Sequence, residues 1–202
     1  MLGDNLFFGH GLPEMLRLAA ARTKGATIFA YQVRDPQRYG VVFFDAAGRA
    51  VRIEEKPPDA RSNWAITGLY FFDNDVVRYA AEVKPSWRGE LEITDVHNCY
   101  LAARALHVEK MGRGFAWLDT GTFDSLIDAA SVVQTLEQRQ GLKIVCLEEI
   151  AYRMGFIGRS HLLELVKSLK KRGYGDYLLH ITDSNPSVRP THSGRRKRNR
   201  CK

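Results

Sequence analysis

The chain has 202 residues, 45% of them hydrophobic and 26% charged, which is ordinary for a soluble globular protein with one large core or two small ones. No apolar run approaches the ~20 residues that span a bilayer, and the first residues carry no signal-peptide pattern, which predicts a cytoplasmic protein. The formal net charge of +7 comes from residues 187–202, which contain seven basic residues and no acidic one, so the rest of the chain is neutral.

The first 122 residues are rich in strand patterns. Runs of β-branched and aromatic residues predict six strands, at residues 26–33, 41–45, 50–55, 67–72, 107–111 and 115–118. Apolar residues at helical spacing predict three helices, at residues 12–21, 74–83 and 92–105. Between the second and third strands, Gly48 is expected to take a positive φ in a tight hairpin. Hairpins combined with strand–helix alternation predict a mixed α/β sheet.

The strand signal nearly vanishes after residue 122. Residues 123–140 place their apolar side chains on one helical stripe, and Gly141 is a plausible C-terminal stop. Residues 160–171 predict a further helix, with Ser160 as its N-cap and Gly173 as its stop.

The last residues are predicted to form a basic, disordered tail, because they have few apolar groups to bury. Seven cations can bind nucleic-acid phosphates nonspecifically, but no aromatic residue lies among them, so we expect no specific nucleic-acid partner. The expected organisation is a sheet domain at residues 1–122, a helical packing and oligomerisation segment at 123–185, and the tail at 186–202.

The three cysteines, at positions 99, 146 and 201, are an odd number at wide spacing, which forms neither a disulfide framework nor a zinc site. We expect Cys99 and Cys146 to be buried and to behave as small apolar side chains. Neither is expected to be reactive.

Six short motifs follow one another along the chain. They are LGDN at residues 2–5, RYGVV at 38–42, EEKP at 54–57, TGLY at 67–70, RGELEITD at 88–95 and WLDTGT at 117–122. In this order they resemble the sugar-1-phosphate nucleotidyltransferases, and within that family most closely the glucose-1-phosphate thymidylyltransferases. The resemblance runs from about residue 2 to about residue 185. It implies a Rossmann-like mixed sheet and a homo-oligomeric assembly, namely a homotetramer.

The family opens with a strand and a Gly-Gly-x-Gly-Thr-Arg-Leu loop that cradles the nucleoside triphosphate, and this sequence contains no such loop. We therefore expect an N-terminally truncated form of the fold, without its nucleotide-binding segment. Without the loop's backbone N–H groups and its arginine, nothing is left to stabilise the leaving pyrophosphate, so the chain alone is expected to be inactive.

Asp4 and Asp119 are the candidate metal ligands. Nucleotidyl transfer accumulates charge on phosphate oxygens, which a divalent cation neutralises, and magnesium needs only one or two protein carboxylates besides the phosphates. Each aspartate is expected to follow an apolar strand, at the edge of the sheet where ligands bind. A lone aspartate in such a place is more often a turn former or a helix N-cap, but the resemblance assigns both residues to Mg²⁺ and to catalysis.

Lys56 and Glu55 are the candidate sugar-phosphate residues. A lysine ammonium is a compact charge that suits a phosphate, and the resemblance places this pair on the sugar side of the cleft, with Lys56 catalytic and Glu55 accepting hydrogen bonds from glucose hydroxyls. The alternative is a solvated strand end. Tyr39 and Gly40 are a further sugar-facing pair, because a glycine lets the backbone approach a ligand closely, although a simple turn explains them equally well.

Five more residues are assigned to the substrate by resemblance alone. Thr67, Gly68 and Tyr70 belong to a strand that lines the glucose pocket in the family, Trp117 would pack against the sugar or the base, and Arg88 would add positive charge. Aromatic residues in strands are usually part of the core, which is the alternative for Tyr70 and Trp117. The acidic residues around Arg88 equally fit the negatively charged start of a helix.

A second, regulatory nucleotide site at subunit contacts is implied by three other segments. These contain Gly9 and His10, Gly112 and Arg113, and residues 146–150. The imidazole and the guanidinium suit a phosphate. A histidine that follows a glycine in a loop is otherwise ordinary surface.

The activity that the resemblance implies is synthesis of dTDP-glucose and pyrophosphate from dTTP and glucose-1-phosphate with Mg²⁺, in dTDP-sugar synthesis such as that of dTDP-rhamnose. A uridylyl or adenylyl transferase of the same fold is the first alternative, since the base is selected largely by the segment that this sequence lacks. The second alternative is a non-catalytic packing or regulatory fragment.

Overall fold

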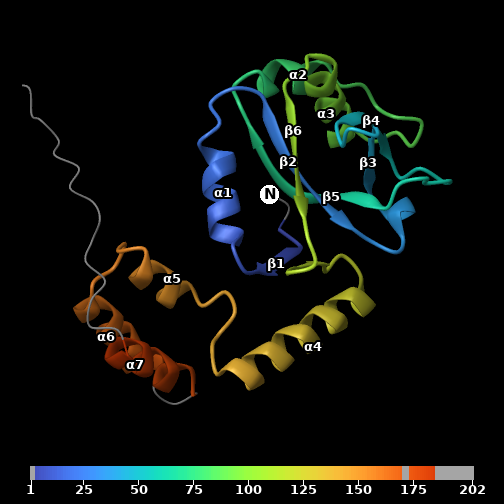
Figure 1. Ribbon diagram of the computed structural model, residues 1–202. Helices are drawn as coiled ribbons and strands as arrows, with labels where there is room; N and C mark the ends of the chain where they lie inside the picture. The colour runs from blue at the N-terminus through green and yellow to red at the C-terminus, as the bar shows by residue number, and fades with distance from the viewer. Residues whose placement is uncertain (1–2, 170–172, 185–202) are drawn as a thin grey trace, which may run out of the picture. The chain divides into compact units, whose positions relative to one another are not determined.

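The computed structural model describes residues 3–169 and 173–184 (Figure 1). The chain forms two compact units, one ending at Ala129 and the other beginning at Ala130. This division lies inside helix α4 (Phe123–Gln140), which starts directly after the boundary predicted at residue 122. The predicted basic tail at residues 186–202 lies outside the described residues.

Five strands form the main sheet of the first unit. Their order is β4-β3-β5-β2-β6, with bounds Ala50–Glu55, Gly40–Phe44, Trp64–Phe72, Ala26–Gln32 and Leu106–Met111. Strand β2 pairs in parallel with β6 and antiparallel with β5, and β3 pairs antiparallel with β4 and β5. The predicted mixed α/β sheet is therefore confirmed. Gly48 has the expected positive φ, of 76°, between β3 and β4.

A second sheet pairs β1 (Asn5–Gly9) with β7 (Phe115–Asp119) in antiparallel orientation. Strand β1 is absent from the sequence-based expectations. Because Asn5 lies opposite Asp119 and Gly9 opposite Phe115, the start of β1 meets the end of β7. Asp4 directly precedes β1, and the strand expected before it falls outside the residues that the structure describes. Antiparallel pairing nevertheless brings both aspartates to the same end of this two-stranded sheet.

Alternate residues of β2 enter two different apolar clusters, as the period of a strand requires. Phe29 packs with Ala19 of α1 (Leu12–Ala20), whereas Ile28 and Ala30 belong to a cluster that Leu101 of α3 (Ile93–Ala102) borders. The sheet is therefore buried between elements on either side of β2, and its strand ends are left to form a site. The helices of this unit are α1 (Leu12–Ala20), the 3-10 helix η1 (Pro36–Arg38), α2 (Val76–Glu82) and α3 (Ile93–Ala102).

The second unit is helical. Its helices are the end of α4, α5 (Leu147–Arg153), α6 (Arg159–Leu169) and α7 (Tyr174–Ser184). Of these, α5 and α7 are not predicted from the sequence. Helix α6 begins before Ser160, which lies in its first turn and is not the predicted N-cap. Gly173 stands directly before α7, where its C=O accepts a hydrogen bond from the Tyr177 N–H (3.1 Å).

The cysteines differ in burial. Cys146 is 3% exposed and packs with Leu162 and Leu178 in the core of the second unit, as predicted. Cys99 is only partly buried, so that expectation is wrong: the buried residues of α3 are Thr94, Val96, His97 and Tyr100. None of the helices described in residues 3–169 and 173–184 is long and apolar enough to cross a membrane.

Candidate active site

Nine of the residues predicted to bind metal or substrate line one cavity of about 250 Å³ in the first unit. They are Asp4, Tyr39, Gly40, Glu55, Lys56, Gly68, Tyr70, Trp117 and Asp119. The remaining lining residues, which the sequence analysis missed, are Asn5, Arg38, Ile66, Ile93 and Thr94. Larger hollows of about 760 and 700 Å³ contain none of the nine, so cavity size alone would have misplaced the site.

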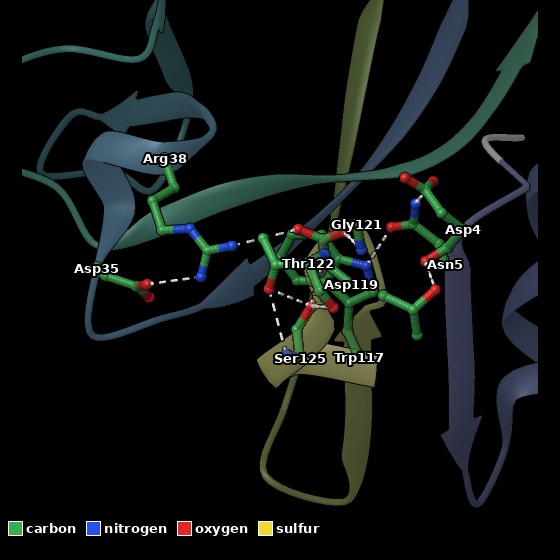
Figure 2. Close-up of polar contacts among 10 residues, drawn as sticks. Asp4, Asn5, Asp35, Arg38, Trp117, Asp119, Gly121, Thr122 and Ser125 are labelled. Atoms are coloured by element: carbon green, nitrogen blue, oxygen red, sulfur yellow. Dashed lines mark hydrogen bonds and ion pairs between the residues drawn. The ribbon is translucent and has the colours of Figure 1, made fainter. Parts of the chain in front are cut away.

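Asp4 is oriented by its neighbour Asn5. The Asn5 Nδ2–H donates to Asp4 Oδ1 (2.8 Å), and Asn5 Oδ1 in turn accepts from the Trp117 Nε1–H (2.5 Å; Figure 2). Gly68 makes room for this amide, because a Cβ at that position would lie 2.8 Å from Asn5 Nδ2. Trp117 therefore acts on Asp4 through Asn5, which explains why an asparagine follows the aspartate.

Asp119 is oriented from two sides. The Gly121 N–H donates to Oδ1 (3.0 Å), and the Arg38 guanidinium Nη2 lies 3.7 Å from Oδ2 (Figure 2). Thr120 joins the two aspartate segments, since both its N–H and its hydroxyl donate to the Asp4 carbonyl oxygen at 2.8 Å. The WLDTGT motif thus holds its own aspartate and the Asp4 backbone in one hydrogen-bonded unit.

The two carboxylates fit a divalent cation. A Cβ at Gly121 would lie 3.1 Å from Asp119 Oδ1 and 3.5 Å from Asp4 Oδ2, so one oxygen of each aspartate borders the same side-chain-free space. Two carboxylates and no third titratable ligand suit a cation that takes its other oxygens from water and phosphate. Within the described residues, no group of three or more His, Cys, Asp and Glu side chains is placed to hold a metal.

A second part of the cavity wall, formed by Tyr39, Glu55 and Tyr70, is partly buried. Burial, and then the nearby charge of Glu92, raises the pKa of Glu55, and burial raises the pKa of Tyr70 to about 12. The Thr94 hydroxyl lies close enough to Glu55 to oppose that rise, yet its buried Oγ1 makes no hydrogen bond of normal geometry. Tyr39 packs on Trp117 with ring centroids 5.0 Å apart, and burial raises its pKa. This wall combines polar acceptors with aromatic faces.

Lys56 directly follows β4, in a strained backbone conformation. Its φ is 42°, in the left-handed region that non-glycine residues rarely adopt, and its N–H donates to the Tyr39 carbonyl oxygen (3.0 Å). The exposed side chain borders the cavity. The turn therefore places an ammonium at the rim.

Thr67 and Arg88 do not line this cavity. Thr67 is fully buried on β5, one residue before Gly68, so it points to the other face of the strand. Arg88 forms ion pairs with Glu90 and Glu92, and its pKa is raised chiefly by Glu90. Glu92 is the residue directly before α3, as the helix-start alternative expects.

The four residues of the regulatory prediction lie far from the carboxylates. Gly9 ends β1 opposite Phe115, and Gly112 accepts the Phe115 N–H in the turn before β7 (3.1 Å). His10 and Arg113 adjoin these glycines in the sequence. The predicted regulatory residues are thus at the opposite end of the β1–β7 sheet from Asp4 and Asp119.

Known proteins match this arrangement. The family model "Nucleotidyl transferase" matches residues 1–135, and the chain belongs to this family. Glucose-1-phosphate thymidylyltransferase of Neisseria meningitidis is 54% identical over 181 residues, covering 90% of this chain and 63% of the relative. That of Mycobacterium tuberculosis is 52% identical over 185 residues, covering 92% and 64%. This chain therefore spans less than two thirds of the length of these relatives.

Solved structures agree on the fold. A Bacillus anthracis protein, described as a glucose-1-phosphate thymidylyltransferase and solved in complex with sucrose, has a TM-score of 0.56 and 39% identity over 65% of this chain and 52% of its own. A UDP-glucose pyrophosphorylase complexed with UDP-glucose has a TM-score of 0.56 at 23% identity, covering 67% of this chain and 55% of its own, which supports the α/β fold alone.

Proposed function

We propose that this chain carries the sugar-phosphate and metal site of a glucose-1-phosphate thymidylyltransferase, which joins glucose-1-phosphate to dTTP and releases pyrophosphate. The observation that carries the proposal is that the Asp4 and Asp119 carboxylates open on the same cavity as Glu55 and Lys56. Relatives more than 50% identical carry this name, which supports the choice of sugar and nucleotide.

Each side chain has a role in this proposal. The Lys56 ammonium binds the phosphate of the sugar, and Glu55 accepts hydrogen bonds from its hydroxyls. Asp4 and Asp119 would hold Mg²⁺, which when bound neutralises charge on phosphate oxygens. Tyr39 and Tyr70 supply apolar faces and exclude water. Because the sequence contains no Gly-Gly-x-Gly-Thr-Arg-Leu loop, we expect the 202 residues alone to release little pyrophosphate.

We also propose that the protein is a cytoplasmic homo-oligomer. Helix α4 carries three exposed apolar side chains, Phe123 (89% exposed), Leu126 (52%) and Ile127 (63%), which support a contact between copies. The regulatory site at Gly9, His10, Gly112 and Arg113 remains part of this proposal. Light scattering coupled to gel filtration measures the oligomeric state, and a monomer at all concentrations would contradict it.

The site is tested by calorimetric titration of the 202-residue chain with glucose-1-phosphate in the presence of Mn²⁺, a spectroscopically visible substitute for Mg²⁺. We expect binding of glucose-1-phosphate, and at least about tenfold weaker binding after Lys56→Ala, because a charge-assisted contact to phosphate is lost. Glucose-6-phosphate is the control ligand, since it carries the same charge on another carbon. The proposal is rejected if the folded chain does not bind glucose-1-phosphate, or if it binds glucose-1-phosphate and glucose-6-phosphate with equal affinity.

A further inference from the structure

Arg38 is a cavity residue that the sequence analysis left without a role. It ends the 3-10 helix η1, and its side chain is 42% exposed. Nη1 donates to Asp35 Oδ2 (3.1 Å), and Nη2 lies 3.7 Å from Asp119 Oδ2 (Figure 2). The guanidinium carbon lies 5.3 Å from the centre of the Tyr39 ring. One guanidinium therefore bridges an aspartate outside the cavity and the candidate metal ligand within it.

The two contacts differ in kind. The bond to Asp35 has normal hydrogen-bond length, whereas 3.7 Å to Asp119 is too long for a hydrogen bond and leaves an attraction between charges. Asp119 Oδ1 already accepts the Gly121 N–H, so Oδ2 is the oxygen that Arg38 faces. Arg38 is thus held by a hydrogen bond to Asp35, whereas its contact with Asp119 is an electrostatic attraction without a hydrogen bond.

We propose that Arg38 competes with a divalent cation for Asp119, so that it weakens binding of the cation and strengthens binding of the anionic sugar phosphate at the same cavity. This inference rests on the proposed metal role of Asp119. Arg38 is a positioning residue in this scheme: it neutralises the carboxylate, yields it to the cation, and stays at the cavity rim because Asp35 holds it.

The charges that line the cavity give the two effects opposite signs. Three carboxylates, of Asp4, Glu55 and Asp119, face two cations, of Arg38 and Lys56. Removal of the Arg38 charge makes the cavity more negative, which attracts a divalent cation more strongly and repels a phosphate dianion. A structural defect would instead weaken both ligands. Opposite shifts therefore identify a charge effect.

Arg78 provides a matched control. It lies on α2, 57% exposed, with Glu82 at 3.8 Å and its guanidinium 4.3 Å from the centre of the Tyr79 ring. It does not line the cavity. Arg78→Met therefore removes the same charge from a similar ion pair beside a tyrosine, away from the candidate site.

The experiment titrates the 202-residue chain and its variants with Mn²⁺, followed by electron paramagnetic resonance, and with glucose-1-phosphate, followed by calorimetry. For Arg38→Met we expect Mn²⁺ to bind about threefold to tenfold more tightly and glucose-1-phosphate to bind more weakly by a similar factor, since solvent screens a half-exposed charge. Arg38→Lys should restore most of both affinities, and Arg78→Met should change neither.

Each other outcome has a defined meaning. If Arg38→Met binds Mn²⁺ no more tightly than wild type, the proposed role of Arg38 is wrong. The metal site itself still stands in that case, provided that Asp119→Asn loses the Mn²⁺ binding seen in wild type. Mn²⁺ binding that persists in Asp119→Asn, or is absent from the wild-type chain, rejects the metal site and with it both proposals. Arg38→Gln is the second charge-removing variant. If Arg38→Met does not show the tryptophan fluorescence of the folded chain, the result for Arg38→Gln is used in its place.

Discussion

The two units of this protein treat buried polar groups differently. In the first unit, the side-chain oxygens of Thr67 and Thr94 and both ring nitrogens of His97 are buried without a hydrogen-bond partner. In the second unit, the Tyr174 hydroxyl donates to Glu148 and lies 3.1 Å from Cys146 Sγ. Among the described residues of the second unit, no buried side-chain nitrogen or oxygen lacks a partner.

This difference separates a binding region from a packing region. A buried polar group without a partner costs about 1–3 kcal/mol, so a fold retains one where something else compensates. Thr94 borders the cavity, where a bound sugar hydroxyl can supply the missing partner. The hydrogen bonds of Tyr174 are internal and raise the pKa of its hydroxyl together with burial, the largest cause. The second unit is therefore expected to contribute stability rather than ligand contacts.

The largest expected effect is a loss of packing in the second unit. Leu178 of α7 is fully buried and packs in one cluster with Leu162 and Val166 of α6, so Leu178→Ala should destabilise that unit by about 2–5 kcal/mol. Helical circular dichroism in urea measures this change. Leu147→Ala, at a residue 70% exposed on α5, is the control and should change stability by less than about 0.5 kcal/mol. If the folded Leu178→Ala chain binds glucose-1-phosphate with altered affinity, the second unit does more than contribute stability, and the comparison between the two units fails.

The next effect concerns His97 and pH. Burial lowers the pKa of His97 from 6.5 to about 4. Between these pH values the His97 imidazole is therefore neutral in the native state but protonated in the unfolded state. The first unit should therefore lose about 3 kcal/mol as pH falls from 6.5 to about 4. His97→Phe, which keeps an aromatic ring beside Phe72, should remove this dependence.

Tryptophan fluorescence is the readout for His97, because all three tryptophans, Trp64, Trp87 and Trp117, lie in the first unit. Urea midpoints are measured at several pH values between 7 and about 4. An equally steep loss of stability in wild type and His97→Phe would show that other groups cause it.

A smaller effect is expected at Tyr174. Tyr174→Phe removes a donor from the Glu148 carboxylate, and hydrogen bonds to charged groups contribute about 1.5–3 kcal/mol. We expect a loss in that range from the second unit, with Mn²⁺ and glucose-1-phosphate affinities unchanged. Circular dichroism and calorimetry on the same preparation test the two halves of this statement. A loss of ligand affinity at full folding would assign Tyr174 to a binding role.

The smallest effect sharpens the comparison at the cavity itself. Thr94→Val should leave the first unit as stable as before or up to about 1 kcal/mol more stable, because it removes a buried hydroxyl without a partner. Glucose-1-phosphate should bind about fivefold more weakly, by one hydrogen bond. Thr67→Val is the control, since Thr67 is equally buried and unpartnered but does not border the cavity. If Thr94→Val and Thr67→Val bind glucose-1-phosphate equally well, Thr94 makes no hydrogen bond to the bound sugar.

Local patterns in the sequence predicted many of the elements. The bounds of β4 and α4 agree with the prediction, because the β-branched run in one and the helical stripe in the other are complete within a single segment. Strand β1 and helices α5 and α7 were missed. The Gly175 in the first turn of α7 weakens its helical propensity.

The residue types of the site were present in the sequence motifs, and nine of them meet at one cavity. The tertiary structure alone determined which neighbours orient them. Pairing of β1 with β7 brings Asp4 to Asp119, and packing of α3 turns Thr94 toward the cavity and leaves Arg88 with Glu92. Arg38 meets Asp119 only in the folded chain. Sequence spacing describes what a residue can do, whereas contacts between distant segments depend on strand pairing and packing, which no local pattern encodes.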